Sequence, residues 1–155
     1  MGETYRAFDP GYFSVAPADL KYAQTGAEGM GLRNAIFRLG GDLREAPVVV
    51  MLYMPPQGVL PRHAHACHRM EVVVQGSMLT EDGLWLTPGD VRLSAPGEFY
   101  GPHTAGPAGV LSVEIFSAGG GVDAAFPSDL PAAHLALLEK ARDHILAQQG
   151  PPRAG

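Results

Sequence analysis

Turn residues recur about every 8–12 residues between short apolar runs, from about residue 32 to residue 117. The clearest of these turns are Gly40-Gly41-Asp42, Glu81-Asp82-Gly83, Pro88-Gly89-Asp90 and Ala95-Pro96-Gly97. Spacing this short leaves room for strands and no room for the helices that a doubly wound parallel sheet needs between its strands. The sequence therefore predicts an all-β fold, an antiparallel sandwich or a small barrel.

The apolar runs between the turns are the predicted strands. They lie at residues 35–39, 48–54, 71–74, 78–80, 84–86, 91–94 and 110–116. The run at 48–54 is apolar throughout and ends at Pro55-Pro56, as is typical of a buried strand. The Asp82-Gly83 turn predicts a hairpin between 78–80 and 84–86.

The two ends of the chain follow other patterns. Residues 1–31 predict an irregular N-terminal arm, with one short strand near 12–15. Residues 118–155 predict a linker and one C-terminal helix at about 131–148, where Leu135, Leu138 and Ile145 follow helical spacing. The expected organisation is thus the arm, a β-domain over 32–117, and this helical end.

The net charge and the cysteine content indicate which classes of partner and which cellular compartment to expect. The net charge is −5, from 11 basic and 16 acidic residues, which disfavours nucleic acid as a partner. No apolar run approaches the ~20 residues of a membrane span, and the first residues show no secretory signal pattern. The single cysteine, Cys67, excludes an intrachain disulfide and indicates a reducing cytoplasm. We expect a cytoplasmic protein whose partner is a small-molecule substrate, with neither nucleic acid nor membrane.

Four of the six histidines lie between residues 63 and 103. On a strand, His63 and His65 point to the same face, so both imidazoles can converge on one metal ion at about 2.0–2.1 Å. Glu71 continues that face, and His103, which follows a turn, is the best-placed further ligand. The predicted metal ligands are therefore His63, His65, His103 and Glu71, a set that suits Fe²⁺, Mn²⁺, Ni²⁺ or Zn²⁺.

The same residues resemble a known family. The resemblance of this sequence to the family covers about 32–117 and rests on two groups of residues. The first is Gly58, His63-x-His65, Glu71 and Gly76, and the second is Gly89, Pro96-Gly97 and His103. This arrangement is similar to the two motifs of the cupin superfamily. The resemblance implies a single-domain jelly-roll barrel, a double-stranded β-helix, that holds one divalent metal ion per chain on three histidines and a glutamate.

The sequence departs from the cupin pattern at two positions. Arg69 stands in the slot of the usual glutamate, and Glu71 follows two residues later. Tyr100 stands in the histidine slot of the second motif, and His103 follows three residues later. Two interpretations of the second motif stay open: an insertion in the loop 98–102 restores His103 to the site, or Tyr100 replaces it as a ligand.

A narrower similarity concerns the function. The Gly29-x-Gly31 segment and the Ala95-Pro96-Gly97-Glu98 stretch with His103-Thr104 resemble single-domain cupin dioxygenases of diketones and hydroxyacetophenones. This implies a homodimeric non-haem dioxygenase, with Fe²⁺ as the first choice of metal, that acts on a small oxo or aromatic substrate. Glu71, Arg69 and Tyr100 are its candidate catalytic residues. The alternatives are a non-redox isomerase with Zn²⁺ or Mn²⁺, and a ligand-binding sensor with a degenerate metal site.

Three neighbouring residues have alternative roles. Cys67 is a soft metal ligand or a small buried filler. His68 points away from the site on a regular strand, and only a bulge would turn it inward. Arg69 pairs with Glu71 or binds a substrate carboxylate, and if it pairs, Glu71 orients the site rather than binding metal.

Overall fold

A computed structural model describes residues 2–150 of the chain. It contains a seven-stranded antiparallel sheet whose hydrogen-bonded path runs β1-β2-β7-β4-β5, with β3 paired to β7 and β6 paired to β4. The strands are β1 (Arg33–Arg38), β2 (Val48–Met54), β3 (Val59–Leu60), β4 (Arg69–Leu79), β5 (Trp85–Leu86), β6 (Val91–Ser94) and β7 (His103–Phe116). The all-β prediction is confirmed, as a jelly-roll in which the sheet does not close on itself.

Each predicted run overlaps an observed strand, but the runs 71–74 and 78–80 belong to one strand, β4, and the short strand β3 was not predicted. The hairpin at Asp82-Gly83 is confirmed, since Met78 pairs with Leu86. Strand β4 begins at Arg69 and passes through two irregularities in its register with β7, between Val73 and Gln75 and between Gly76 and Met78. These irregularities let one strand continue across a glycine that the sequence pattern treats as a break.

The N-terminal prediction is wrong in part. Residues 12–15 form no strand, because Tyr12–Ser14 is a 3₁₀ turn, and Lys21–Gly29 forms the helix α1. The arm predicted to be irregular thus contains a helix, and its residues Gly26 and Gly29 lie where α1 meets the second helix. A Cβ at Gly29 would lie 2.8 Å from the Cα of Ala141, so close packing explains glycine in this helix despite its low propensity.

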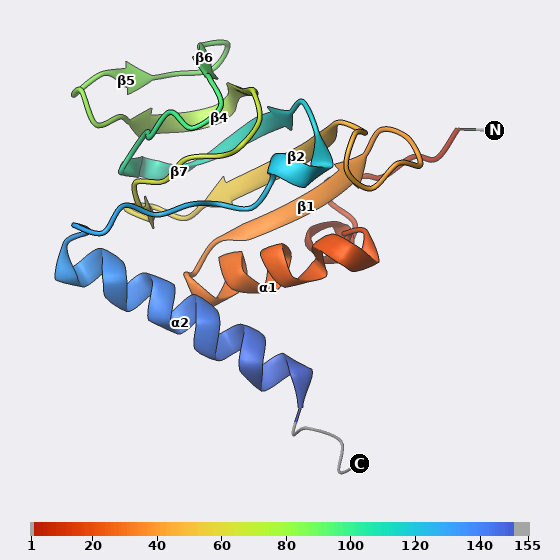
Figure 1. The fold of residues 1–155 in the computed structure, drawn as a ribbon. Helices are drawn as coiled ribbons and strands as arrows, with labels where there is room; N and C mark the ends of the chain where they lie inside the picture. Colours follow the sequence, from red (N-terminus) through yellow and green to blue (C-terminus); the bar gives the residue numbers. More distant parts are fainter. Residues whose placement is uncertain (1, 151–155) are drawn as a thin grey trace.

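The C-terminal helix is confirmed as α2 (Ala132–Gln149). Figure 1 shows α2 (blue) and α1 (orange-red) together on one side of the sheet, with β5 and β6 at its far end. The two helices pack against each other where Gly26 and Gly29 of α1 meet Ala141 and Ile145 of α2, and Ala141 is the buried residue of α2. Within residues 2–150, no helix is long and apolar enough to cross a membrane.

The inward faces of the strands differ across the sheet. On β2, the buried alternate residues are all apolar: Val48, Val50, Leu52 and Met54. On β4 and β7, the buried alternate residues include the charged and polar side chains Arg69, Glu71, Ser112 and Glu114. The interior therefore has an apolar half towards β1, β2 and the helices, and a charged half between β4 and β7.

Candidate functional site

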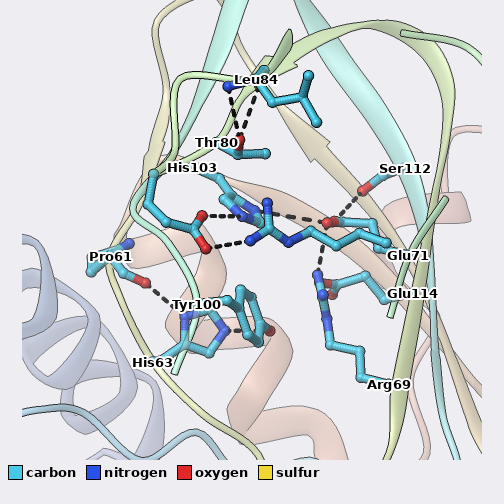
Figure 2. Close-up of polar contacts among 12 residues, drawn as sticks. Pro61, His63, Arg69, Glu71, Thr80, Leu84, Tyr100, His103, Ser112 and Glu114 are labelled. Atoms are coloured by element: carbon cyan, nitrogen blue, oxygen red, sulfur yellow. Dashed lines mark hydrogen bonds and ion pairs between the residues drawn. The ribbon is translucent and has the colours of Figure 1, made fainter. Parts of the chain in front are cut away.

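A cluster of three charged side chains lies inside the fold, between β4 and β7. Glu71 and Glu114 are direct partners in the antiparallel register, and Arg69 lies two residues before Glu71. The side chains of Arg69, Glu71 and Glu114 are 0%, 1% and 8% exposed. Arg69 Nη2 lies 2.9 Å from Glu71 Oε1 and also pairs with Glu114, while Arg69 Nε donates to Glu114 Oε1 at 3.0 Å. One guanidinium thus faces two carboxylates (Figure 2).

The two carboxylates respond differently to this environment. Burial raises the pKa of Glu71, although the adjacent Arg69 opposes the shift, and Ser112 Oγ donates to Glu71 Oε2 at 3.1 Å. Burial also opposes ionisation of Glu114, but the guanidinium outweighs it and holds the pKa of Glu114 below its usual range. Glu114 is therefore the ionised partner of Arg69, and Glu71 is the carboxyl that more readily keeps a proton.

Tyr100 joins the histidine segment to this cluster. Residues 63 and 100 form an isolated antiparallel bridge, and the hydroxyl of Tyr100 lies 2.8 Å from His63 Nε2. His63 Nδ1 lies 2.6 Å from the carbonyl oxygen of Pro61, which can only accept, so Nδ1 carries the proton and Nε2 accepts from Tyr100. The guanidinium carbon of Arg69 lies 4.1 Å from the centre of the Tyr100 ring. Both nitrogens of His63 are thus bonded within the protein.

His65 and His103 are buried on either side of this arrangement. The His65 ring lies 5.0 Å from the His63 ring and 4.7 Å from the Phe116 ring, and its Nδ1 has no hydrogen-bond partner. The two nitrogens of His103 lie 3.7 Å from Glu71 Oε1 and 3.4 Å from Glu81 Oε2, and neither makes a hydrogen bond. Burial lowers the pKa of His63 to about 3 and that of His103 to about 4, so both imidazoles are neutral at pH 7.

The predicted metal ligands are close neighbours, but their present arrangement does not fit an ion. No three His, Cys, Asp or Glu side chains among residues 2–150 are placed to hold a metal. His63 Nε2 is bonded to Tyr100, and Arg69 lies against Glu71. Metal binding by His63, His65, His103 and Glu71 therefore stays a prediction from the sequence.

The structure answers the other questions about the motif. Arg69 pairs with Glu71, as one of the two interpretations expected. Tyr100 and His103 are both buried in the interior, 5.4 Å apart between ring centres, so the site contains both residues. Cys67 is buried against Gly121, which matches its role as a filler, and His68 is exposed.

The sequence reasoning missed Glu114. In the run 110–116, Leu111, Val113 and Ile115 form the more apolar face, which the pattern predicts to be buried. The structure instead buries Ser112, Glu114 and Phe116 more deeply, because this face meets Arg69 and the histidines. A lone glutamate in an otherwise apolar run was the available signal.

An apolar cavity of about 590 Å³ opens beside the histidines. Its walls come from the sheet and from both helices, including Ile36, Val50, Leu52, Ala27 and Ile145. Its polar lining residues include Asn34, His63, His65 and Glu114 from the β-domain and Arg142 from α2. The hydroxyl of Tyr22 on α1 bonds to Asp123, and both line the cavity. The cavity has the size and the uneven polarity of a small-molecule site.

The buried neutral histidines predict acid sensitivity. The folded-state pKa of His63 is about 3 against an ordinary 6.5, so between these values the unfolded chain binds a proton that the folded chain does not. Stability is therefore complete above pH 6.5 and falls as the pH falls towards 3, by about 1.4 kcal/mol per pH unit for each such histidine. Urea denaturation at stepped pH measures this slope.

Two variants check whether the buried histidine causes this dependence of stability on pH. His63→Gln keeps a polar side chain but cannot ionise, and its stability should fall less steeply with acid. The exposed His68 gives the matched control, since His68→Gln should leave the slope unchanged. A wild-type stability that is flat across this range would contradict the burial of neutral imidazoles.

Comparison with known proteins supports the fold and goes no further. No family model and no curated protein matches the chain. Among solved structures, the polyketide cyclase RemF of Streptomyces resistomycificus has a TM-score of 0.52 and 18% identity, over 71% of this chain and 83% of that one. At this identity the likeness shows a shared fold.

Two further structures match with lower TM-scores. An RmlC-like cupin of Shewanella frigidimarina has a TM-score of 0.45 and 24% identity, over 57% of this chain and 77% of that one. The complex of Rhodobacter sphaeroides SigE with the anti-sigma ChrR gives a TM-score of 0.48 and 21% identity, over 56% of this chain. In that match the chain spans only 45% of the other chain's length.

Proposed function

We propose that this chain, a single-domain protein of the cupin fold, recognises a small and mostly apolar molecule that carries a hydroxyl group, such as a phenol or an enol. One observation carries the proposal. Two buried residues that line the apolar cavity of about 590 Å³, His65 and Asn34, each have a buried polar atom without a hydrogen-bond partner, Nδ1 and Oδ1. Buried acceptors without a donor are costly, and a ligand hydroxyl is the group that satisfies them.

The rest of the cavity selects the body of the ligand. Its walls are aliphatic and aromatic side chains from the sheet, the two helices and Phe126, which favour a ring system over a charged or sugar-like molecule. Of the charged residues in the lining, Glu114 is already paired with Arg69, and Asp123 and Arg142 are opposite in sign, so the lining offers no net charge to an ionic ligand. These features support a neutral hydroxylated ring compound.

His65 gives this site its chemistry. Burial lowers the pKa of His65, so the imidazole is neutral, and in the tautomer protonated at Nε2 its unpartnered Nδ1 accepts the proton of a bound hydroxyl. Tyr100 acts as a positioning residue, because its hydrogen bond fixes the His63 ring that packs edge-on against His65. The proposed activity is thus recognition of a phenol or enol and acid–base activation of its oxygen.

A set of three related ligands tests the proposal. Isothermal titration would compare naphthol, which donates a hydrogen bond, with methoxynaphthalene, which keeps the oxygen but cannot donate, and with naphthalene. We expect naphthol to bind about fivefold more tightly than either, since one buried hydrogen bond contributes about 1 kcal/mol. His65→Phe should remove this preference while naphthalene still binds.

Matched alanine variants locate the binding site. Ala23 of α1 lines the cavity, and Ala23→Phe should fill it and abolish binding of all three compounds. Ala136 of α2 is exposed and does not line the cavity, so Ala136→Phe should bind as the wild type does. Equal affinity for naphthol and methoxynaphthalene, or unchanged binding in Ala23→Phe, would overturn the proposal.

A metal-dependent dioxygenase of a small oxo or aromatic compound is the second candidate. One observation favours it: His65 and His103 both have buried ring nitrogens without partners, and neutral imidazole nitrogens are common metal ligands. Metal analysis of protein purified without a histidine tag, with oxygen uptake on a diketone, tests this candidate. Iron near one per chain together with oxygen uptake would favour the dioxygenase. Absence of both iron and oxygen uptake would exclude it.

A further inference from the structure

We infer that the guanidinium of Arg69 fills the cation position of this site, so that the chain itself supplies the positive charge that a metal ion supplies in the metal-binding cupins it resembles. This inference does not depend on the ligand proposed above. It rests on where the guanidinium lies, on what surrounds it, and on the position of Arg69 in the sequence.

The charges inside the fold balance without an ion, because Arg69 offsets the ionised Glu114, and Glu71 is the carboxyl that more readily keeps a proton. Glu71 and Glu114 are buried directly opposite each other, and two buried carboxylates require a cation nearby. Arg69 meets both, through Nη2 at 2.9 Å from Glu71 and through Nε at 3.0 Å from Glu114. A divalent ion added beside this guanidinium would meet a fixed positive charge at close range.

The space around the guanidinium is also occupied. The Tyr100 ring covers the guanidinium at 4.1 Å, and the same tyrosine bonds His63 Nε2, the nitrogen that a metal would need. Tyr100 lies close to both His63 and His103, with ring centres 4.5 Å and 5.4 Å away. The Tyr100 ring thus lies against the rings of both His63 and His103, with the Arg69 guanidinium over its face (Figure 2).

Arg69 and Tyr100 both stand at motif positions where the cupin resemblance implies a metal ligand. Arg69 stands in the slot where the cupin resemblance implies a glutamate ligand, and Glu71 on the same strand face pairs with it. Tyr100 likewise stands in the slot of a histidine ligand. The two departures from the motif are thus residues in contact with each other, Arg69 as the cation beside the carboxylates and Tyr100 as the ring against it.

Metal content and metal binding test the inference. Protein purified without a histidine tag should contain far less than one equivalent of iron, zinc, manganese or nickel by plasma mass spectrometry. Added Co²⁺ should leave the Arg69 Nε–H signal of the wild type unchanged in a nitrogen-15 NMR spectrum, whereas a paramagnetic ion bound beside it would broaden that signal. A stoichiometric resident metal, or loss of the Arg69 signal with Co²⁺, would overturn the inference.

Two variants of Arg69 test whether its positive charge is what excludes a metal ion. Arg69→Gln removes the cation and leaves the two carboxylates and three histidines, so this variant should bind Zn²⁺ at least about tenfold more tightly than the wild type. Arg69→Lys keeps a cation in place and should bind Zn²⁺ no better than the wild type. Equal Zn²⁺ affinity in all three proteins would contradict the inference, and if Arg69→Gln does not fold, the wild-type measurements decide. Naphthol binding is measured separately, so a failure of the ligand proposal and a failure of this inference remain distinguishable.

Discussion

Replacing Arg69 with methionine is expected to lower the free energy of unfolding by about 3–5 kcal/mol, the usual cost of removing one partner from a buried ion pair. The variant leaves Glu71 and Glu114 opposite each other without a cation, in a place where both side chains are almost fully buried. Urea denaturation followed by circular dichroism measures the change. The loss should shrink as the pH is lowered, because protonation removes the repulsion between the two carboxylates.

A compensated variant separates the charge effect from the loss of packing. The triple change of Arg69→Met, Glu71→Leu and Glu114→Leu replaces the whole cluster with apolar side chains of similar size. Such replacements are often neutral or stabilising, so the triple variant should recover most of the stability that Arg69→Met loses. If the triple variant were as unstable as Arg69→Met, the uncompensated carboxylates would not be the cause of the loss.

Replacing Gly76 with alanine is expected to cost about 3 kcal/mol or more, because two separate penalties add at this position. Gly76 has a φ of +80°, which side chains other than glycine rarely adopt. A Cβ there would also overlap the carbonyl oxygen of Gly109, a backbone atom that cannot move aside alone. Thermal or urea denaturation measures the loss.

Gly83 provides the matched control for this variant. Its φ is +79°, but nothing lies within 4 Å of a Cβ built on it, so Gly83→Ala should cost only about 1 kcal/mol of backbone strain. The difference between the two variants reports the contact between β4 and β7 at the irregular register. Similar losses in both variants would show that strain alone acts at Gly76.

Gly76 affects the candidate site because it lies in the pairing of β4 with β7. Strands β4 and β7 carry Arg69, Glu71, Ser112 and Glu114, and their pairing brings Glu71 opposite Glu114. Because alternate residues point to opposite faces, a shift of one residue would turn these side chains out of the interior. A partly folded Gly76→Ala variant should therefore also lose naphthol binding.

Most of the fold could be predicted from local sequence patterns. The regular turns and the apolar run at 48–54 indicate an antiparallel β-structure, and helical spacing indicates α2. Helix α1 could not be predicted in the same way, because Gly26 and Gly29 are unfavourable in an isolated helix. They are explained only by the close approach of α2, a contact between segments that are far apart in the sequence.

The candidate site could be predicted only in part, for a similar reason. Strand alternation correctly placed Arg69 and Glu71 on one face. The His63 and His65 rings do lie together, 5.0 Å apart, but the predicted strand there is wrong, because His63 lies in an isolated bridge and His65 in a loop before β4. Glu114 comes from another strand, and its position opposite Glu71 depends on the register of β4 with β7. Tyr100 reaches His63 through an isolated bridge, which no local pattern predicts.

The central claim is that Arg69 supplies the cation inside the fold and that the cavity beside it binds a ligand. The most direct test is a crystal structure of the protein grown with naphthol, with anomalous diffraction recorded at the iron and zinc absorption edges. The expected result is a guanidinium between Glu71 and Glu114, no anomalous peak among the histidines, and the naphthol oxygen within hydrogen-bond distance of His65 Nδ1. An anomalous peak bound by His63, His65 and His103, with Arg69 displaced from the two carboxylates, would contradict it.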